Sequence, residues 1–408
     1  QSCLMEITQQ GEVVRHEMHD GVIHSDARMT YVEVNAILAE GDSPTRTRFL
    51  ALAPVFELMR ALFEVLARRR RRRGSIDFDL KESELVFDEA GLVAAITAAE
   101  RNVAHHIIEE FMLLANEVVA EHLRACDMPT LYRVHDAPNI TKVLEFEEFI
   151  TTLGYSLAAK EGNAKPVHFQ RLVKRIKGMP EEKPIALLML RTMQKARYDP
   201  VCVGHFGLAA ASYTHFTSPI RRYPDLVVHR ALREARSGKL SVGRRRDLSK
   251  ELPGLALETS KLERRAEEAE RELVQWKKVR FMADKVGDEF EGYVIGVTSF
   301  GLFVELVEHF VEGLVHISTM ADDYYRFLER EHVLLGEATG KGYRLGDRVT
   351  TQVVRVDLER RQVDLGLADI LESVRISERN RGARRSKVRL KRETRTLRKT
   401  RKGGARRR

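Results

Sequence analysis

Apolar positions change their spacing along the chain, and the change predicts two folded parts. Over the first 285 residues they recur mainly every three or four positions, as in residues 54–66, 100–125 and 262–284. This spacing is typical of amphipathic helices, and the short alternating runs between them are typical of strands. We therefore expect residues 1–285 to form an α/β domain.

From residue 286 the apolar runs become short, alternate with polar residues and are separated by turn-forming residues. Short strands at even spacing are typical of a small β-barrel. The expected strands are residues 289–297, 301–306, 312–317, 345–349 and 353–357, with 362–365 close by. Residues 286–368 are therefore expected to form an all-β, five-stranded barrel of the OB type.

Alternating residues also predict strands inside the first domain. Two hairpins and one further strand are expected, at residues 1–6 with 13–19, 84–88 with 92–96, and 131–135. Residues 140–198 read as mostly helical. We interpret this helical part as scaffold that leads the chain to the polar motif at residues 204–230.

The net charge of +9 is divided unevenly between the body of the chain and its end. Residues 375–408 contain 17 Lys or Arg against two glutamates, a net charge of +15, which leaves −6 for the preceding 374 residues. A basic segment attached to an acidic body indicates a polyanionic partner. Residues 369–408 have few apolar positions, so we expect a basic tail that is disordered when free.

The cysteines and the hydropathy of the chain indicate its cellular compartment. Cys3, Cys126 and Cys202 are scattered and share no metal-ligand or redox spacing, which favours a reducing compartment. No apolar run is long enough to cross a membrane, and the first residues do not resemble a signal peptide. We therefore expect a cytoplasmic protein without membrane contact.

Two neighbouring arginines lie at a predicted helix start. Pro219 disfavours a helical conformation at Ser218, so the chain turns there before the helix that begins around Leu226. Arg221 and Arg222 then lie near the helix N-terminus, where the dipole favours an anion over a cation. A phosphate bound between them is one interpretation, and solvated arginines beside a turn are the other.

The residues around this turn resemble a known family. The chain reads His-Phe-Thr-Ser-Pro-Ile-Arg-Arg-Tyr-Pro-Asp-Leu at 215–226 and Gly-His-Phe-Gly-Leu at 204–208, with matching stretches at 73–78 and 108–116. These motifs are similar to those of the RNase II / RNase R family of processive 3′→5′ exoribonucleases. The basic tail makes the resemblance stronger for RNase R, which implies an RNB-type catalytic domain.

The resemblance implies roles for several residues of the first domain. Arg221 would stabilise charge on the scissile phosphate, and Glu270 resembles an active-site position. Phe78 would stack on a base near the 3′ end, although a core phenylalanine is the alternative. Glu110 would accept a hydrogen bond from a ribose hydroxyl, and a surface glutamate is the alternative. The remaining RNA-binding candidates of this domain are Arg222 and Tyr223.

The second domain resembles an OB fold of the ribosomal S-one type. Its expected RNA-facing positions are aromatic or lie in a C-terminal pair, and they are Phe300, Phe303, His316, Asp357 and Arg361. Aromatic rings stack on bases without sequence preference. Single-stranded RNA is therefore the expected partner, with ribosome-associated RNA as a second candidate.

Six consecutive arginines, Arg68 to Arg73, follow the helix predicted at 54–66, and Gly74 stands where a C-cap belongs. Basic residues in a last turn are favourable to the helix dipole. We interpret this run as a solvated helix end, with direct RNA contact as the alternative. The chain is then expected to enter a strand from Gly74 to Asp79.

The family carries metal-binding aspartates, one Asp followed by a D-x-D-D cluster, and no such cluster occurs in this sequence. Mg²⁺ is expected for the intact family, so we name no metal ligand here and expect the chain to be N-terminally truncated. The predicted function is 3′→5′ hydrolysis of RNA to nucleoside 5′-monophosphates, and activity of these 408 residues alone is in doubt. The alternative is a non-catalytic RNA-binding or regulatory protein. We expect a monomer.

Overall fold

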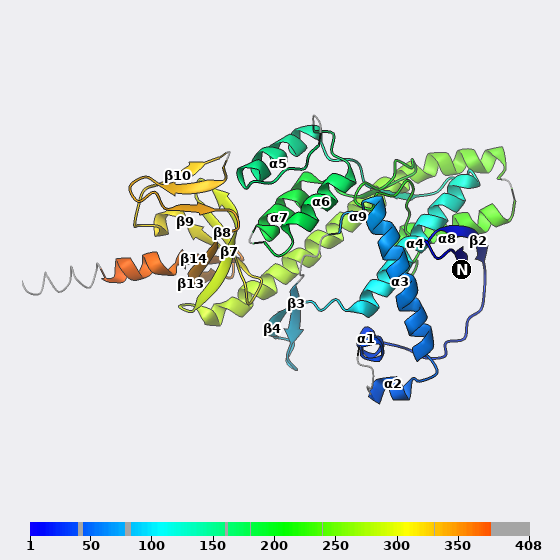
Figure 1. Ribbon diagram of the computed structural model, residues 1–408, viewed down its shortest axis with the longest axis horizontal. Coiled ribbons are helices and arrows are strands. Elements are labelled where there is room, and N and C mark those ends of the chain that lie inside the picture. Colours follow the sequence, from blue (N-terminus) through cyan, green and yellow to red (C-terminus); the bar gives the residue numbers. More distant parts are fainter. Residues whose placement is uncertain are drawn as a thin grey trace, which may run out of the picture. The chain divides into compact units, whose positions relative to one another are not determined.

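The computed structural model describes residues 1–39, 44–77, 83–159, 162–179, 181–238, 240–329 and 331–376. The chain divides into two compact units (Figure 1). The first comprises residues 1–82 and 98–271, and the second comprises 83–97 and the chain from Glu272 onward. Phe78 and most of the basic tail lie outside the described residues, so the predictions made for them are not addressed by the structure.

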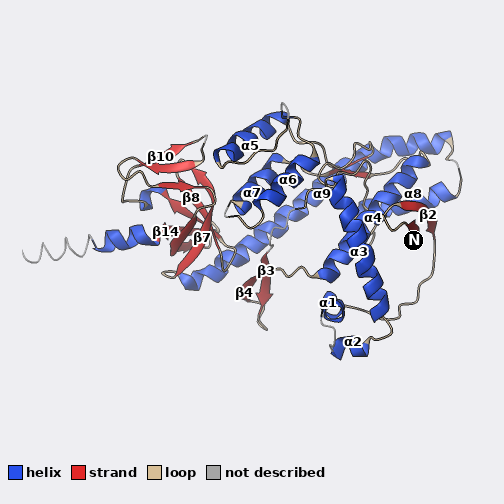
Figure 2. Ribbon diagram, in the orientation of Figure 1, coloured by secondary structure: helices blue, strands red, loops and turns tan. Residues whose placement is uncertain are grey.

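The first unit is mainly helical and also contains short paired strands (Figure 2). β1 pairs antiparallel with β2, and β5 pairs antiparallel with β6. Its elements are β1 (Ser2–Ile7), β2 (Val13–His19), α1 (Tyr31–Ala39), α2 (Pro44–Arg48), α3 (Ala53–Arg73), α4 (Val103–Ala125), β5 (Tyr132–Val134), α5 (Ile140–Thr152), α6 (Pro166–Ile176), α7 (Glu182–Thr192), β6 (Arg197–Asp199), α8 (Tyr223–Arg236) and the first part of α9 (Val242–Met282).

Helix α4 forms the centre of one core cluster of this unit. Its apolar face packs with α8 and with the inner face of the β1–β2 hairpin, as the burial of Val119, Leu123 and Leu232 shows. The stripe predicted from the spacing of apolar residues in 100–125 is therefore confirmed as a helix. Asn102 caps its N-terminus, since the side-chain oxygen accepts from the amides of Ala104 and His105.

The C-terminus of α3 is confirmed at the arginine run. Gly74 adopts φ 96°, and its amide hydrogen bonds to the carbonyls near the helix end. A Cβ at this position would lie 3.0 Å from the side chain of Val167, so the left-handed conformation and the close approach of α6 both favour glycine.

Two sequence-based expectations differ from the structure. The strand expected from Gly74 is wrong over Ser75–Asp77, which pairs with no strand and is instead held by single hydrogen bonds such as Ile76 amide to Gly207 carbonyl. The helix expected at 262–284 begins at Val242 and runs for 41 residues. Its first half has an irregular apolar pattern and contains Pro253, which explains why the spacing did not reveal it.

The second unit is built around a closed five-stranded barrel in the order β13-β14-β9-β8-β7, which confirms the predicted OB-like barrel. A separate three-stranded sheet, β10-β11-β12, forms from the segment rich in Asp and Tyr. The strands are β7 (Glu289–Thr298), β8 (Gly301–Leu306), β9 (Glu312–His316), β10 (Tyr325–Leu328), β11 (Val333–Gly336), β12 (Gly342–Arg344), β13 (Arg348–Asp357) and β14 (Gln362–Leu367).

One strand of the barrel differs from the prediction. The apolar pattern predicts two strands, at residues 345–349 and 353–357, but β13 is one strand that spans Arg348–Asp357. Polar residues at Thr350 to Gln352 interrupt the apolar pattern, and the register irregularity at Val353/Arg355 shows a bulge further along. Thr351 and Gln352 are nevertheless buried, which the sequence pattern could not indicate.

The hairpin β3 (Ser83–Phe87) and β4 (Val93–Ala98) packs with the barrel, although it lies within the first domain in sequence. Ile96 is buried in the same core cluster as Leu302, Val315 and Leu365 of the barrel strands. The compact units therefore differ from the predicted division at 285/286, because the hairpin and α9 from Glu272 onward both belong to the second unit.

Among the described residues, no helix combines the length and hydropathy needed to span a membrane.

Candidate nucleic-acid interface

A tight turn fixes the arginine pair ahead of α8. The amides of Arg221 and Arg222 both donate to the Ser218 carbonyl, at 3.3 and 3.0 Å. Asp225, fully buried in the first turn of α8, accepts from the Ser218 amide at 2.7 Å and from Arg222 Nη2 at 2.8 Å. One carboxylate oxygen therefore holds both ends of the turn.

This arrangement separates the two arginines. Arg222 is directed to Asp225 and its side chain is 22% exposed, whereas Arg221 is exposed at the tip of the turn. Tyr223 is also exposed, and the guanidinium of Arg230 lies 5.9 Å from its ring centre. Arg221 is thus the one of the pair that is presented to solvent, while Arg222 stabilises the turn.

Asn116 of α4 ties the same motif to the core. It is buried, donates from Nδ2 to the Tyr213 hydroxyl at 3.0 Å and accepts at Oδ1 from the Phe216 amide at 2.9 Å. A single amide therefore fixes the extended segment that leads into the turn. Asn116 is one of the buried residues of α4, and these two hydrogen bonds give the reason for a buried polar residue there.

Two histidines near the turn are kept neutral by burial. Desolvation lowers the pKa of His205 to about 3 and the pKa of His215 to about 2, with Arg222 and Arg133 contributing to the second shift. Burial raises the pKa of Tyr198 to about 12, and its hydroxyl is hydrogen bonded to His215 Nδ1 at 2.8 Å. His205, His215 and Tyr198 pack near the motif, and none of them changes its protonation state near neutral pH.

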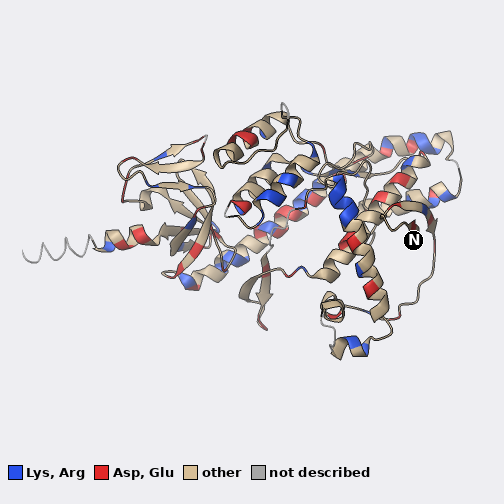
Figure 3. Ribbon diagram, in the orientation of Figure 1, with Lys and Arg blue, Asp and Glu red and all other residues tan. Residues whose placement is uncertain are grey.

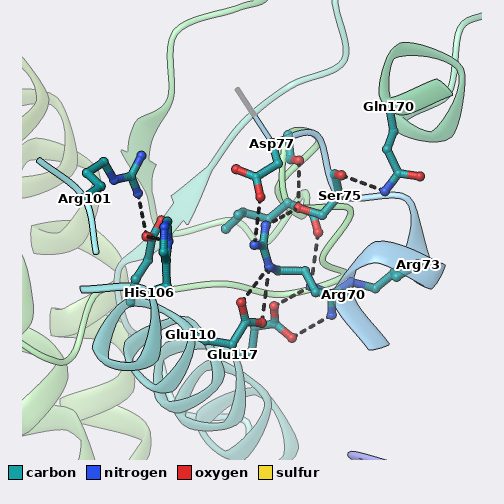
Figure 4. Close-up of polar contacts among 12 residues, drawn as sticks. Arg70, Arg73, Ser75, Asp77, Arg101, His106, Glu110, Glu117 and Gln170 are labelled. Carbon is teal, nitrogen blue, oxygen red and sulfur yellow. Dashed lines mark hydrogen bonds and ion pairs between the residues drawn. The ribbon is translucent and has the colours of Figure 1, made fainter. Parts of the chain in front are cut away.

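The arginine run is joined to Glu110 by a buried ion pair (Figure 4). Arg70 Nε donates to both carboxylate oxygens of Glu110, at 3.2 and 3.0 Å, and Arg70 Nη2 reaches Asp77 at 3.2 Å. The side chain of Glu110 is 6% exposed and that of Arg70 is 15% exposed. The structure thus places Glu110 in an ion pair and not on the open surface.

A second ion pair lies one turn further along α3 and two turns further along α4. Arg73 contacts Glu117 with both terminal nitrogens, at 2.7 and 2.6 Å, and donates to the Leu208 carbonyl at 3.1 Å. Gln170 of α6 donates to the carbonyls of Arg71 and Ser75 at 2.8 and 2.9 Å. These contacts hold residues 75–77 in place, directly before the predicted nucleotide-stacking residue Phe78.

Burial dominates the protonation of Glu110. Desolvation raises the pKa of its carboxyl, and the charge and hydrogen bonds of Arg70 oppose that rise. A buried carboxylate with one cationic partner depends strongly on that partner. The predicted contact of Glu110 with a ribose hydroxyl stays a prediction.

The remaining candidate of the first unit, Glu270, lies exposed on α9. Its assigned role rests on the resemblance alone. We call Arg70, Arg73, Asp77, Glu110 and Glu117 the Arg70 cluster. In the part of the chain that the structure describes, neither Glu270 nor Arg221 forms an ion pair with a residue of this cluster.

Three candidates of the barrel gather at the β8 and β9 strands. Phe300 is 45% exposed, its ring lies 5.9 Å from that of Phe303 in an edge-on arrangement, and Gly301 pairs with His316 across the strands. A Cβ at Gly301 would lie 2.2 Å from the Val315 carbonyl oxygen, so the close approach requires glycine. Phe300 and His316 are exposed and Phe303 is half-buried, so the predicted stacking of bases on these three residues stays a prediction.

The other two barrel candidates are engaged with different partners. Asp357 accepts from the Arg360 amide and lies 3.7 Å from Arg355, whereas Arg361 pairs with Glu272 at 3.2 Å. They therefore do not form a pair with each other in this structure. Their RNA-binding roles stay predictions.

The described residues contain no group of three or more His, Cys, Asp or Glu side chains arranged to hold a metal ion. We therefore name no metal-binding residue and assign no step to a metal ion.

Sequence reasoning missed Asp225 and the pairing of Glu110 with Arg70. Asp225 lies within the recognised motif, and its place three residues after Arg222 at a helix start was the available signal. The pairing of Arg70 with Glu110 joins residues 40 positions apart, and no local pattern indicates it.

Models of two known domain families match most of the chain. The RNB domain model matches residues 1–238, and the S1 RNA binding domain model matches residues 283–368. Ribonuclease R of Aquifex aeolicus is 44% identical over 371 residues, which is 90% of this chain and 52% of that protein. Ribonuclease R 1 of Lactococcus lactis is 41% identical over 364 residues, 89% of this chain and 44% of that protein.

A solved structure of Mycoplasma genitalium RNase R in complex with ribose methylated single-stranded RNA superimposes with a TM-score of 0.82 at 28% identity, covering 90% of this chain and 57% of that one. The chain spans about half the length of the curated relatives it matches. The RNB model covers more than half of the 408 residues. The chain therefore belongs to the RNB-domain family, with ribonuclease R among its relatives.

Proposed function

We propose that this chain has the RNA-holding groups of a 3′→5′ exoribonuclease that degrades single-stranded RNA to nucleoside 5′-monophosphates in the cytoplasm, and that the 408 residues by themselves bind RNA without cutting it. One observation carries the proposal: the structure presents Arg221 to solvent on a turn whose other polar groups, Arg222 and Asp225, bind each other. Such a guanidinium is free to take a phosphate bidentately. Membership of the RNB-domain family and the presence of an S1 domain support RNA as the source of that phosphate.

The residues of the chain have separable tasks in this proposal. Arg221 orients the phosphate and stabilises its charge, and the fixed turn ensures that little reorganisation is needed. Phe300, Phe303 and His316 hold bases by stacking. A divalent metal, which we take to be Mg²⁺, would supply activation of water when bound, and the described residues show no group of three or more candidate ligands for it.

In this proposal Glu110 accepts a hydrogen bond from a ribose hydroxyl while it remains paired with Arg70. Both of its oxygens are engaged by Arg70, so a ribose hydroxyl would donate to an oxygen whose position is already fixed. A preorganised acceptor loses little conformational freedom on binding. Ribosome-associated RNA as a second partner and a monomeric state are also parts of the proposal.

Replacing Phe300 by alanine is expected to weaken binding of single-stranded RNA by roughly 1 to 3 kcal/mol, about five- to 160-fold, because one base loses the ring on which it stacks. Fluorescence anisotropy with labelled oligoadenylate measures this. Tyr324 is another exposed aromatic residue of the same unit and provides a matched control, Tyr324→Ala. Equal losses in both variants, or none in Phe300→Ala, would contradict the assigned stacking surface.

A further inference from the structure

The arginine run presents two opposite faces of α3. With 3.6 residues per turn, Arg70 and Arg73 lie on one side of the helix, and Arg68, Arg71 and Arg72 lie on the other. The exposures agree with this geometry, since the side chains of Arg70 and Arg73 are 15% and 28% exposed whereas the other three are exposed. Figure 3 shows Lys and Arg gathered along this end of the helix.

Only two of the arginines, Arg70 and Arg73, lie on the inner face of α3, which is the side that contacts Glu110 and Glu117. Arg70 and Arg73 neutralise Glu110 and Glu117, and Gly74 already satisfies the helix end through its amide. The helix dipole favours cations in the last turn, but Arg68 stands at i−3 and i−4 to Arg71 and Arg72, where like charges repel. The outer face thus holds more positive charge than the helix end requires.

Helix α6 extends the charge beyond α3. Its Gln170 donates to the Arg71 carbonyl at 2.8 Å, and Lys174 Nζ lies 3.5 Å from Gln170 Oε1. Lys174 is exposed, so an ammonium group lies one side chain away from the end of α3. We call Arg68, Arg71, Arg72 and Lys174 the outer basic face.

We propose that the outer basic face binds the phosphate backbone of RNA at a site separate from the turn that carries Arg221. Arg68, Arg71 and Arg72 lie on the side of α3 opposite to the Arg70–Glu110 ion pair, so they cannot contact the ribose that Glu110 would bind. Arginines suit this contact because each guanidinium can bind two phosphate oxygens. Contacts to phosphates alone carry no base preference, so this site adds affinity and not specificity.

RNA fits the outer basic face better than an acidic protein segment does. Exposed arginines dominate the face, and their rigid planar forks match the repeated, regularly spaced phosphates of a nucleic acid. The inference rests on the proposed RNA function of the chain, and it adds a second place at which the strand is held.

The test measures how RNA affinity depends on salt for the full chain. The variant Arg68→Gln/Arg71→Gln/Arg72→Gln is expected to reduce the slope of log affinity against log salt by about 0.7 for each phosphate that the protein no longer neutralises, about 2 in total. The matched control is Arg246→Gln/Lys261→Gln/Arg265→Gln, which removes the same charge from exposed positions of α9. Its slope is expected to stay close to that of the unmodified chain.

Three other outcomes have distinct meanings. Equal slopes for the two triple variants would overturn the outer basic face, while RNA binding by the unmodified chain would still support the proposed function. Failure of the unmodified chain to bind RNA at low salt would overturn the proposed function and the inference with it. Binding of polyglutamate, a probe for an acidic protein segment, is measured on the same proteins. If Arg68→Gln/Arg71→Gln/Arg72→Gln loses as much polyglutamate binding as RNA binding, the assignment of RNA is overturned and the ligand is an acidic protein segment. Unchanged thermal unfolding of both variants verifies that they are folded.

Discussion

Replacing Arg70 by alanine is expected to lower the free energy of unfolding by about 3–5 kcal/mol, because it leaves the buried carboxylate of Glu110 without its cation. The neighbouring variant Arg71→Ala removes the same side chain from an exposed position of the same helix. Its expected change is within about 0.5 kcal/mol. Urea unfolding of both variants measures the difference, and similar losses would show that Glu110 does not depend on Arg70.

The loss in Arg70→Ala is expected to depend on pH in a defined direction. Burial raises the pKa of Glu110 in the folded chain, so its contribution to stability is present at acid pH and is lost as pH rises through the raised pKa. Removing Arg70 takes away the charge that opposes this rise. The deficit of Arg70→Ala is therefore expected to be smallest near pH 4 and to grow toward neutral pH, roughly tracking ionisation of a carboxyl group.

A double variant separates ionisation from packing. Arg70→Ala/Glu110→Gln carries no titrating group at position 110, so its deficit is expected to be nearly independent of pH. A pH-dependent deficit of equal size in the double variant would assign the effect to other groups of the cluster, such as Asp77 or Glu117.

Asp225→Ala is the second variant with a large expected effect, a loss of about 3–5 kcal/mol in the free energy of unfolding. Its carboxylate is fully buried and holds both the Ser218 amide and Arg222, which would each be left without this partner. We also expect the turn to loosen, so that Arg221 no longer has a fixed position. Asp20, which is exposed and paired only at the surface, supplies the control variant Asp20→Ala with little expected change.

The positioning part of this prediction has its own readout. Arg221→Ala is expected to weaken RNA binding in the unmodified chain, and to have a much smaller effect when Asp225 is already alanine. Anisotropy measurements on the four members of this double-mutant cycle give the coupling. Additive effects would show that Asp225 stabilises the fold without positioning Arg221.

Local patterns in the sequence predicted the features that depend on neighbouring residues. The helix before Gly74, the helix of residues 103–125 and the barrel each follow from spacing, capping and turn residues. The motif around Arg221 was found in the same way, because a proline and a helix start lie next to each other.

Features that depend on distant residues were not predictable in this way. The pairing of Arg70 with Glu110, the anchoring of Phe216 by Asn116 and the packing of β3–β4 with the barrel join segments far apart in the chain. Residues 75–77 show the same limit, because alternation favoured a strand while a partner strand was lacking in the described structure. Tertiary contacts also explain why Glu110, a glutamate on a helix, is buried.

The most direct measurement of the proposed function is incubation of the 408-residue chain with labelled single-stranded RNA and Mg²⁺, followed by separation of bound, intact and degraded RNA. The residues that the structure describes provide an exposed arginine, Arg221, and exposed aromatic rings but no group of three or more possible metal ligands, so we expect RNA to be bound and left intact. Release of mononucleotides that is abolished by Arg221→Ala, and so does not come from a contaminating nuclease, would contradict this expectation and show that the chain itself completes a metal site.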